Sequence, residues 1–175
     1  MSDPTDIVVR ALRAEDAAQW RELRLEALRT CPTAFAMSYE ESSLQDLAVF
    51  ASLIPPPDGP NVLFGAFRGE VLAGSAGFRV YAGLKQRHKG QLWGVYVDPS
   101  LRGRGVGAAL VRSVIERARM QVAVLQLSVQ IDNAPARALY RQLGFAPYGV
   151  ERRALRHDGK DYDDELMAMD FLGPA

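Results

Sequence analysis

One stretch of the chain, residues 91–130, most restricts the folds that it can adopt. The β-like run QLWGVYV (91–97) leads through a glycine-rich turn into an amphipathic helical pattern, and the apolar run VAVLQLSVQ (122–130) follows. A strand, a crossover helix and a second strand in one sheet are right-handed and make the two strands parallel. We therefore expect one parallel pair of strands whose carboxyl ends lie on the same side, beside the glycine-rich turn.

The segments before this stretch indicate a strand, helices and a hairpin. The run IVVRAL (7–12) is β-branched, and the apolar residues after it recur at helical spacing until Pro32. Residues 33–54 predict one or two further helical segments, which the run PPPDGP ends. Two β-like runs joined by RGE then predict a hairpin, and we expect the strand at 91–97 to pair antiparallel with it.

Helical and strand signals also follow the stretch. A helix over 133–145 has Asp132 or Asn133 as its cap, Pro135 in its first turn and Gly144 at its end. Two β-like runs around RHDGKD form a second hairpin. The predicted order is β-α-α-β-β-β-α-β-α-β-β, with one parallel crossover in a mostly antiparallel mixed sheet. This is an α/β fold of the α+β kind, and we expect a single domain over residues 1–175.

Charge and composition exclude several functional classes. The 175 residues include 21 Lys and Arg and 21 Asp and Glu, so the overall field does not favour nucleic acid or an anionic membrane. Cys31 is the single cysteine and no export signal opens the sequence, which predicts a cytoplasmic protein. Two basic clusters, KQRHK (85–89) and RRALRH (152–157), are interpreted as charged strand turns that oppose aggregation, rather than as a surface for an acidic protein or RNA.

The glycine-rich turn has the features of an anion site. Gly103, Gly105 and Gly107 leave main-chain amides uncovered at the positive end of a helix, and Arg102 and Arg104 add charged donors. A diphosphate fits this arrangement. A Walker A loop is excluded because the last glycine is followed by AAL, where Lys and then Ser or Thr are required, and no magnesium site is suggested.

A dinucleotide site is the main alternative for this turn. Gly103, Gly105 and Ala108 satisfy the pattern G-x-G-x-x-G/A, and Asp132 lies near the end of the next strand, where a ribose-binding acid is expected. However, the five residues DPSLR separate the strand from the first glycine, and no second set of alternating strands and helices follows. The context therefore favours a different phosphate-bearing ligand.

The sequence resembles the GNAT superfamily of acyl-coenzyme A-dependent N-acyltransferases. Arg102, Gly105 and Gly107 match the family signature Q/R-x-x-G-x-G/A. The segments LWGVYVDPSLRGRGVGAALV and NAPARALYRQLGF, together with the β-α-α start, also fall in the family's order and cover most of the chain. The resemblance implies the GNAT fold, acetyl-coenzyme A as the acetyl donor, and no metal.

The resemblance also implies a set of coenzyme-binding residues. The glycine-rich turn would hold the diphosphate, and the main chain of the central strand would pair with the pantetheine arm. Asn133 and Tyr140, two helical turns apart, would face the coenzyme from one side of their helix, with Tyr140 as the acid that protonates the departing thiolate. The full predicted set is Val95, Tyr96, Val97, Arg102, Gly103, Arg104, Gly105, Val106, Gly107, Ala108, Asn133 and Tyr140.

The resemblance defines the catalytic base less well. Some relatives have a glutamate at about the position of Gln91, and a glutamine cannot replace it as a base. By location in the family, the candidates to replace it are Glu40, Glu41, Asp161 and Asp163. Acceptor contacts are expected in PTAFAMSYEE (32–41), from Phe35, Ser38, Tyr39 and Glu41.

These observations predict an N-acetyltransferase that moves an acetyl group from acetyl-coenzyme A to a primary amine. Attack is expected to be direct, because the sequence contains no evident positioned nucleophile for a covalent acyl-enzyme. The acceptor is a small molecule or a protein, and homodimers are common among similar proteins. The alternatives are a non-catalytic coenzyme A sensor, an NAD(P)-binding oxidoreductase and a protein-binding module.

Overall fold

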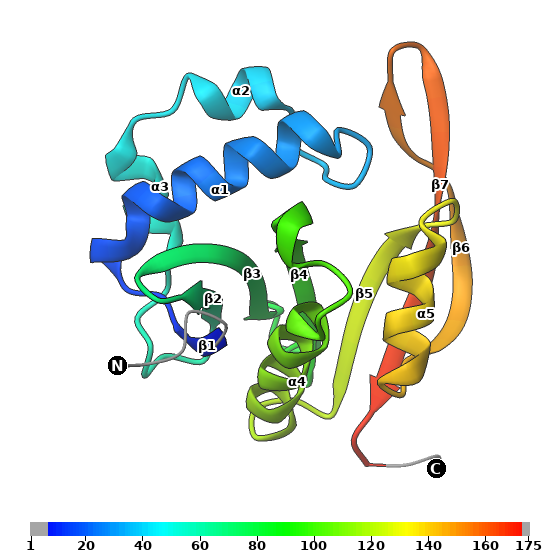
Figure 1. Ribbon diagram of the computed structural model, residues 1–175. Helices are drawn as coiled ribbons and strands as arrows, with labels where there is room; N and C mark the ends of the chain where they lie inside the picture. The colour runs from blue at the N-terminus through cyan, green and yellow to red at the C-terminus, as the bar shows by residue number, and fades with distance from the viewer. Residues whose placement is uncertain (1–6, 173–175) are drawn as a thin grey trace.

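A seven-stranded sheet in the order β1-β2-β3-β4-β5-β7-β6 forms the centre of the computed structural model, which describes residues 7–172 (Figure 1). Each pair of neighbouring strands is antiparallel except β4 and β5, which are parallel. The predicted order of the strands and the single parallel crossover are therefore confirmed, while three helices, rather than the two in the predicted order, lie between β1 and β2. The strands are β1 Ile7–Ala11, β2 Val62–Arg68, β3 Val71–Val80, β4 Lys89–Val97, β5 Val124–Gln130, β6 Ala146–His157 and β7 Lys160–Asp170.

Helices cover both faces of this sheet. They are α1 Ala17–Thr30, α2 Tyr39–Ser43, α3 Leu47–Leu53, α4 Val106–Arg119 and α5 Ala134–Gln142, with short 3-10 turns at Ala14–Asp16 and Pro99–Leu101. The side chains of β2 alternate between the faces, so that Val62 and Ala66 pack with α4 while Leu63 packs with α1 and α3. We call these two sides the α4 face and the α1 face. Tyr140 and Phe145 join the core of the α4 face, which places α5 on that side as well.

The parallel pair is short. β4 and β5 pair only from Lys89–Gln91 to Val124–Gln126, and beyond these residues the two strands diverge toward their carboxyl ends (Figure 1). β4 stays with β3 across a register shift, where Gly77 pairs with Trp93 and Ser75 with Tyr96. The shift lies beside Gly94, whose φ of 63° is left-handed and favours glycine. This bulge bends the end of β4 away from β5.

The ends of α5 follow the sequence signals. Asn133 is its cap and accepts a hydrogen bond from the Ala136 amide at 3.2 Å, and Pro135 lies in the first turn. Gly144 follows the helix with a φ of 101°, as the predicted left-handed end requires. Both predictions for this helix are confirmed.

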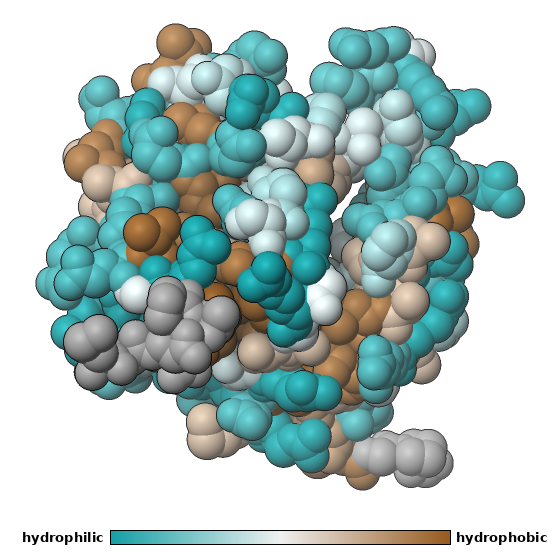
Figure 2. Space-filling model, in the orientation of Figure 1, coloured by the Kyte–Doolittle hydropathy of each residue, from teal (hydrophilic) through white to brown (hydrophobic). Residues whose placement is uncertain are grey.

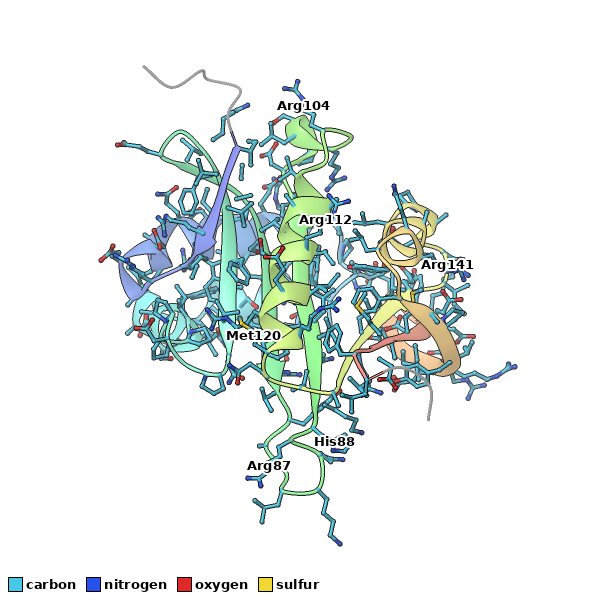
Figure 3. The ribbon with its side chains drawn as sticks, turned by 90° about the horizontal axis from the view of Figure 1, so that it is seen from below. Arg87, His88, Arg104, Arg112, Met120 and Arg141 are labelled. Atoms are coloured by element: carbon cyan, nitrogen blue, oxygen red, sulfur yellow. The ribbon has the colours of Figure 1, made fainter. Side chains whose placement is uncertain are left out.

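The basic cluster 85–89 lies far from the glycine-rich turn. In Figure 3, Arg87 and His88 are at the tip of the β3–β4 connection, whereas Arg104 is at the opposite end of α4. Within residues 7–172, moreover, no helix combines the length and the apolar character that crossing a membrane requires.

We expect Gly77→Ala to destabilise the protein, because the Trp93 indole lies directly over Gly77. A Cβ on residue 77 would come within 2.5 Å of Trp93 Cζ2, so the indole would have to move. The expected cost is about 1–3 kcal/mol in the free energy of unfolding. Urea denaturation followed by tryptophan fluorescence measures it. Gly83→Ala is the control, since its Cβ would meet only Gln86, at 3.4 Å; equal stability of the two variants would contradict this packing.

Candidate active site

The glycine-rich turn between β4 and α4 is fixed by polar contacts at its start. Asp98 Oδ1 accepts hydrogen bonds from the amide and hydroxyl of Ser100 at 2.8 and 2.6 Å, which closes the 3-10 turn. Arg102 Nε then donates to the Val97 carbonyl at 3.1 Å. Gly103 and Gly105 follow with φ values of 74° and 79°, a left-handed backbone that other residues adopt only with strain.

The main-chain amides of this turn are free to bind a ligand. Among the described residues, none of the amides from Gly103 to Ala108 donates a hydrogen bond, and the first to do so is that of Ala109, to the Gly105 carbonyl at 2.9 Å. α4 begins at Val106, so the last three of these six amides belong to its first turn. Consecutive free amides at the positive end of a helix bind phosphate oxygens.

The edge of β4 nearest to β5 is open beyond the short parallel pairing. The Asp98 amide donates to β3 at 2.8 Å and Tyr96 pairs with β3, so both residues turn their main chain toward that strand. Because main-chain groups alternate along a strand, those of Val95 and Val97 face the side from which β5 has diverged. Tyr96, which the sequence groups with these valines, instead directs its buried ring into the core of the α1 face.

α5 brings Asn133 and Tyr140 to the other side of this gap. The Tyr140 ring is buried and packs edge to face against Phe145, with 5.9 Å between the ring centres. Burial raises the pKa of the Tyr140 phenol, so the side chain stays protonated at neutral and mildly alkaline pH. A neutral phenol in this position is a hydrogen-bond donor to whatever occupies the gap.

An ion-pair cluster anchors α5 to β7. Glu165 is buried, and its carboxylate accepts hydrogen bonds from Arg137 Nε and Nη2 at 3.0 Å each and from Arg141 Nη2 at 2.8 Å. The Arg137 guanidinium is the main cause of the lowered pKa of Glu165, and Arg141 adds to it. The cluster therefore holds the helix that carries Asn133 and Tyr140 at a set distance from β4.

A channel of about 140 Å³ lies in the gap between β4 and β5. Its lining includes Leu127, Val129 and Tyr140, which belong to the core of the α4 face, and Phe35 and Trp93, which pack on the α1 face. The channel is therefore lined from both faces of the sheet at the point where the strands separate, with the open edge of β4 along one wall.

A larger cleft of about 480 Å³ adjoins the channel on the α1 face, and the two share Phe35, Trp93 and Gly94 as lining residues. Further walls of this cleft come from α1, α3 and β3. Figure 2 shows the surface notched between the part that carries α1 and α2 and the part that carries β6 and β7. A smaller cavity of about 210 Å³, lined in part by Tyr39, Glu40 and His157, lies between the same two parts.

The predicted acceptor-side residues lie in different parts of the structure, and only some of them line the cleft or the channel. Phe35 lines both the channel and the cleft. Ser38 and Glu41 instead form the capping box of α2, in which the Ser38 hydroxyl accepts from the Glu41 amide at 3.1 Å and the Glu41 carboxylate accepts from the Ser38 amide at 3.2 Å. Neither residue contributes to the walls of the cleft.

The carboxylates proposed as bases are also outside the cleft. Asp161 pairs with Arg156 at 2.6 Å on the β6–β7 hairpin, and Asp163 accepts from the Arg153 amide at 2.8 Å. Gln91 does line the cleft, where its Oε1 accepts a hydrogen bond from Arg79 Nε at 2.8 Å. The described lining of the cleft therefore contains no carboxylate that could act as a base.

The sequence gives only an indirect signal for Glu165. It lies in the run DYDDE, in which four of the five residues are acidic, so this run alone does not single out Glu165. Two observations distinguish it: Glu165 shares the inward face of β7 with the buried Met167, and Arg137 and Arg141 stand four residues apart on one side of α5. An acidic residue on the buried face of a strand, together with such an arginine pair on a neighbouring helix, predicts an ion-pair cluster of this kind.

Comparison with known proteins decides the family. The model of the acetyltransferase (GNAT) family matches residues 18–145. The chain belongs to this family. Acetyl-coenzyme A is the acetyl donor of GNAT enzymes, and membership gives no support to the oxidoreductase alternative.

Individual relatives agree with this assignment. The chain is 38% identical over 101 residues to the N-alpha-acetyltransferase RimI of Mycobacterium tuberculosis, and the match covers 58% of this chain and 62% of that protein. It is 35% identical over 78 residues to the L-amino acid N-acetyltransferase AaaT of Escherichia coli, which covers 43% and 48% of the two chains. The matches thus span about half the length of these relatives, and never two thirds.

A solved structure supports the fold. The putative acetyltransferase yncA from Salmonella typhimurium, determined with acetyl-coenzyme A, superposes with a TM-score of 0.78 at 20% identity, covering 97% of this chain and 96% of that one. The GNAT fold predicted from the sequence is therefore confirmed.

We expect Glu165→Gln to destabilise the protein in a pH-dependent way. The substitution removes the charge that two guanidinium groups contact, at a cost of about 2 kcal/mol, or roughly 4–8 °C in the unfolding midpoint at pH 7. Because pairing lowers the pKa of Glu165, its stabilising effect is complete above the ordinary glutamate pKa of about 4.3 and is lost as the pH falls through the lowered value. The two proteins should differ at neutral pH, and the difference should shrink as the pH falls below the ordinary glutamate pKa of about 4.3.

Thermal unfolding from about pH 3 to 8 tests this expectation. Glu116→Gln is the matched control, because Glu116 is exposed on α4 and should change the midpoint little at any pH. Equal midpoints for wild type and Glu165→Gln at pH 7 would show that the cluster does not anchor α5.

Proposed function

We propose that this protein transfers an acetyl group from acetyl-coenzyme A to a primary amine by direct attack. One observation carries the proposal: the six free amides from Gly103 to Ala108 stand at the same end of the diverging strands as the channel between β4 and β5. The turn follows the open edge of β4 along the chain, and Leu139, which lines the channel, would lie 3.5 Å from a Cβ built on Gly107. This arrangement suits a long ligand with a phosphate at one end and a reactive group at the other.

Each part of this arrangement has a role in the proposal. The amides of the turn, with Arg102 and Arg104, hold the diphosphate. The main chain of Val95 and the amide of Val97, whose carbonyl already accepts from Arg102, pair with the pantetheine arm. Asn133, whose side-chain oxygen is used in capping α5, offers its amide nitrogen to the coenzyme. The thioester then lies near Gly94, where the channel meets the cleft.

The acceptor amine reaches the thioester from the cleft. Its nitrogen attacks the carbonyl carbon, the carbon–sulfur bond breaks, and Tyr140 donates its phenolic proton toward the leaving thiolate. A free thiol has a pKa of about 8.5, well below that of the buried phenol, so solvent readily returns the proton to Tyr140. The proton of the amine leaves through water, since the described lining of the cleft has no carboxylate.

The reaction requires no metal in this proposal. Among residues 7–172, no group of three or more His, Cys, Asp or Glu side chains is arranged to hold a metal ion. Direct attack needs only a positioned thioester, a neutral amine and a proton donor. We assign the activity to the cytoplasm, following the prediction from the sequence.

Binding of acetyl-coenzyme A is the first test. At 100 times its dissociation constant it should stabilise the protein by about 2.7 kcal/mol, or on the order of 5–10 °C in the unfolding midpoint, while NAD(P)H should have no effect. Release of thiol when amines are added then distinguishes an enzyme from a coenzyme A sensor. A shift with NAD(P)H alone would overturn the proposal.

We expect Gly105→Ala to weaken acetyl-coenzyme A binding about tenfold. A Cβ at this position has open space, so the effect arises from backbone strain at a φ of 79° rather than from a clash. The free turn relaxes to a conformation that alanine tolerates, and binding must restore the original at a cost of about 1.4 kcal/mol. Isothermal titration calorimetry measures the affinity.

Gly69→Ala is the matched control for this variant. Gly69 also has a left-handed φ, 62°, and open space around its Cβ position, but it lies in the β2–β3 turn. It should suffer the same strain and keep its affinity. Equal losses of affinity in both variants would remove the glycine-rich turn from the coenzyme site.

Tyr140→Phe should lower kcat by roughly 10²-fold or more and leave the affinity for acetyl-coenzyme A almost unchanged, because it removes only the proton donor. Since the pKa of Tyr140 is raised, the wild-type rate should not fall between about pH 8 and 10 through loss of this proton. Steady-state kinetics over this range is the measurement, and Tyr148→Phe, at an exposed tyrosine of β6, is the control. An unchanged kcat would exclude Tyr140 as the acid.

A further inference from the structure

The charge of the cleft indicates what kind of amine enters it. Arg24 and Arg79 are among its lining residues, and the described lining includes no Asp, Glu, Lys or His. Most of the remaining wall is apolar, and its aromatic members are Trp20, Phe35, Phe50, Phe78 and Trp93. The volume of about 480 Å³ is in the range of small-molecule sites. The cleft is thus a small apolar pocket with positive charge.

Arg24 is the more informative of these two arginines. Its neighbours on α1 are paired, Arg21 with Glu22 at 3.2 Å and Arg29 with Glu26 at 2.6 Å. Arg24 makes no ion pair or hydrogen bond within the described residues, and its guanidinium stacks on the Phe35 ring at 4.4 Å. Burial without a counter-charge lowers the pKa of Arg24 to about 10.

The position of Arg24 connects it to the reaction. Its Nη1 would lie 3.8 Å from a Cβ built on Gly94, the residue at which the cleft and the channel meet. A desolvated charge without a partner is costly for the folded protein, and an anion that binds beside it removes this cost. The free guanidinium therefore stands next to the site of acetyl transfer.

Two orphaned polar atoms complete the pocket. Trp93 Nε1 and Gln45 Oε1 are buried and have no hydrogen-bond partner among the described residues, and both residues line the cleft. Buried polar groups are paired in the great majority of cases, so each of these atoms calls for a partner that water or a bound ligand can supply. The indole can donate to a carboxylate oxygen, and the glutamine oxygen can accept from an N–H group.

We propose that the acceptor is a small amine carrying a carboxylate and an apolar group, as an apolar amino acid does, and that Arg24 binds the carboxylate. This inference rests on the proposed function and narrows its acceptor. A polyamine or a lysine-rich segment would bring further positive charge to Arg24 and Arg79, which like-charge repulsion opposes. In a peptide amino terminus the carboxylate is replaced by an amide, which leaves the buried guanidinium unpaired.

The acetyl transfer itself is unchanged by this assignment. The acceptor nitrogen forms a bond to the acetyl carbonyl carbon as the bond from that carbon to sulfur breaks. Tyr140 supplies the proton with which the coenzyme leaves as a thiol, and the one proton that the neutral amine loses passes to water, which returns a proton to Tyr140. The carboxylate is not consumed. It fixes the nitrogen beside the thioester through a charge-assisted, bidentate contact.

The test compares acids with their amides. Initial rates of thiol release are measured with L-methionine and L-phenylalanine, and with the amide of each, in the wild type, Arg24→Gln and Arg24→Lys. We expect the wild type to prefer the acids by at least tenfold in kcat/KM. Arg24→Gln should lose this preference by slowing the acids tenfold or more while changing the amides less than twofold, and Arg24→Lys should recover part of it. Arg87→Gln, at the tip of the β3–β4 connection, is the matched control and should behave as the wild type (Figure 3).

Other outcomes overturn the inference. These are a wild-type preference for the amides, for spermidine or for a lysine-containing peptide, an equal loss for acids and amides in Arg24→Gln, and no turnover of either acid. The shift of the unfolding midpoint by acetyl-coenzyme A is measured on the same samples. Turnover of another amine with that shift intact overturns only the acceptor class, whereas absence of both binding and turnover overturns the proposed function as well.

Discussion

The separation of β4 from β5 is the constraint on which the rest of the site depends. Two parallel strands normally satisfy each other's main-chain groups along their whole length, but here pairing ends with Gln91 and Gln126. The remaining main-chain groups of β4 need partners, because unpaired buried backbone groups are costly. An extended ligand can supply them, so the fold makes a binding edge by leaving a sheet incomplete.

Opposing contacts keep this gap from closing. On one side, the bulge at Gly94 and the continuous pairing with β3 hold the end of β4. On the other, β5 pairs with β7 along its length, and Glu165 on β7 anchors α5 through Arg137 and Arg141. Tyr140 is consequently supported by the unit of β5, β7 and α5, which pairs with β4 over the short parallel segment. The distance between Tyr140 and the open edge of β4 is then constrained by the short parallel segment at the base of the gap.

Features with local signals were predictable from the sequence. The left-handed turn at Gly103 and Gly105, the cap at Asn133 and the end of α5 at Gly144 each depend on a few neighbouring residues. The crossover was predictable too, since a strand, a helix and a strand have one favoured hand. These local signals define the coenzyme half of the site, which the main chain largely builds.

The acceptor half was not predictable in the same way, because it depends on side chains that meet only in the folded chain. Ser38 and Glu41 have the spacing of a capping box and form one in the structure. They do not line the cleft, where acceptor contacts were expected from the sequence. Arg24 is one of three arginines on α1, with Arg21 and Arg29, and only the folded structure shows that it packs against Phe35 while the other two form ion pairs. Glu165 likewise becomes visible only when β7 is placed beside α5.

The lack of a carboxylate in the described lining of the cleft has a consequence for how the amine loses its proton. Where a glutamate stands at the position of Gln91, it can accept that proton. Here the carboxylate of the proposed acceptor neutralises Arg24, and an ammonium group on the same molecule would bring an unpaired charge into an apolar pocket. Burial and the second guanidinium, Arg79, both lower the pKa of such an ammonium. In the proposed mechanism the neutral, nucleophilic amine is therefore favoured by the environment of the cleft, with water as the final proton acceptor, so the same pocket would both select the acceptor and activate it.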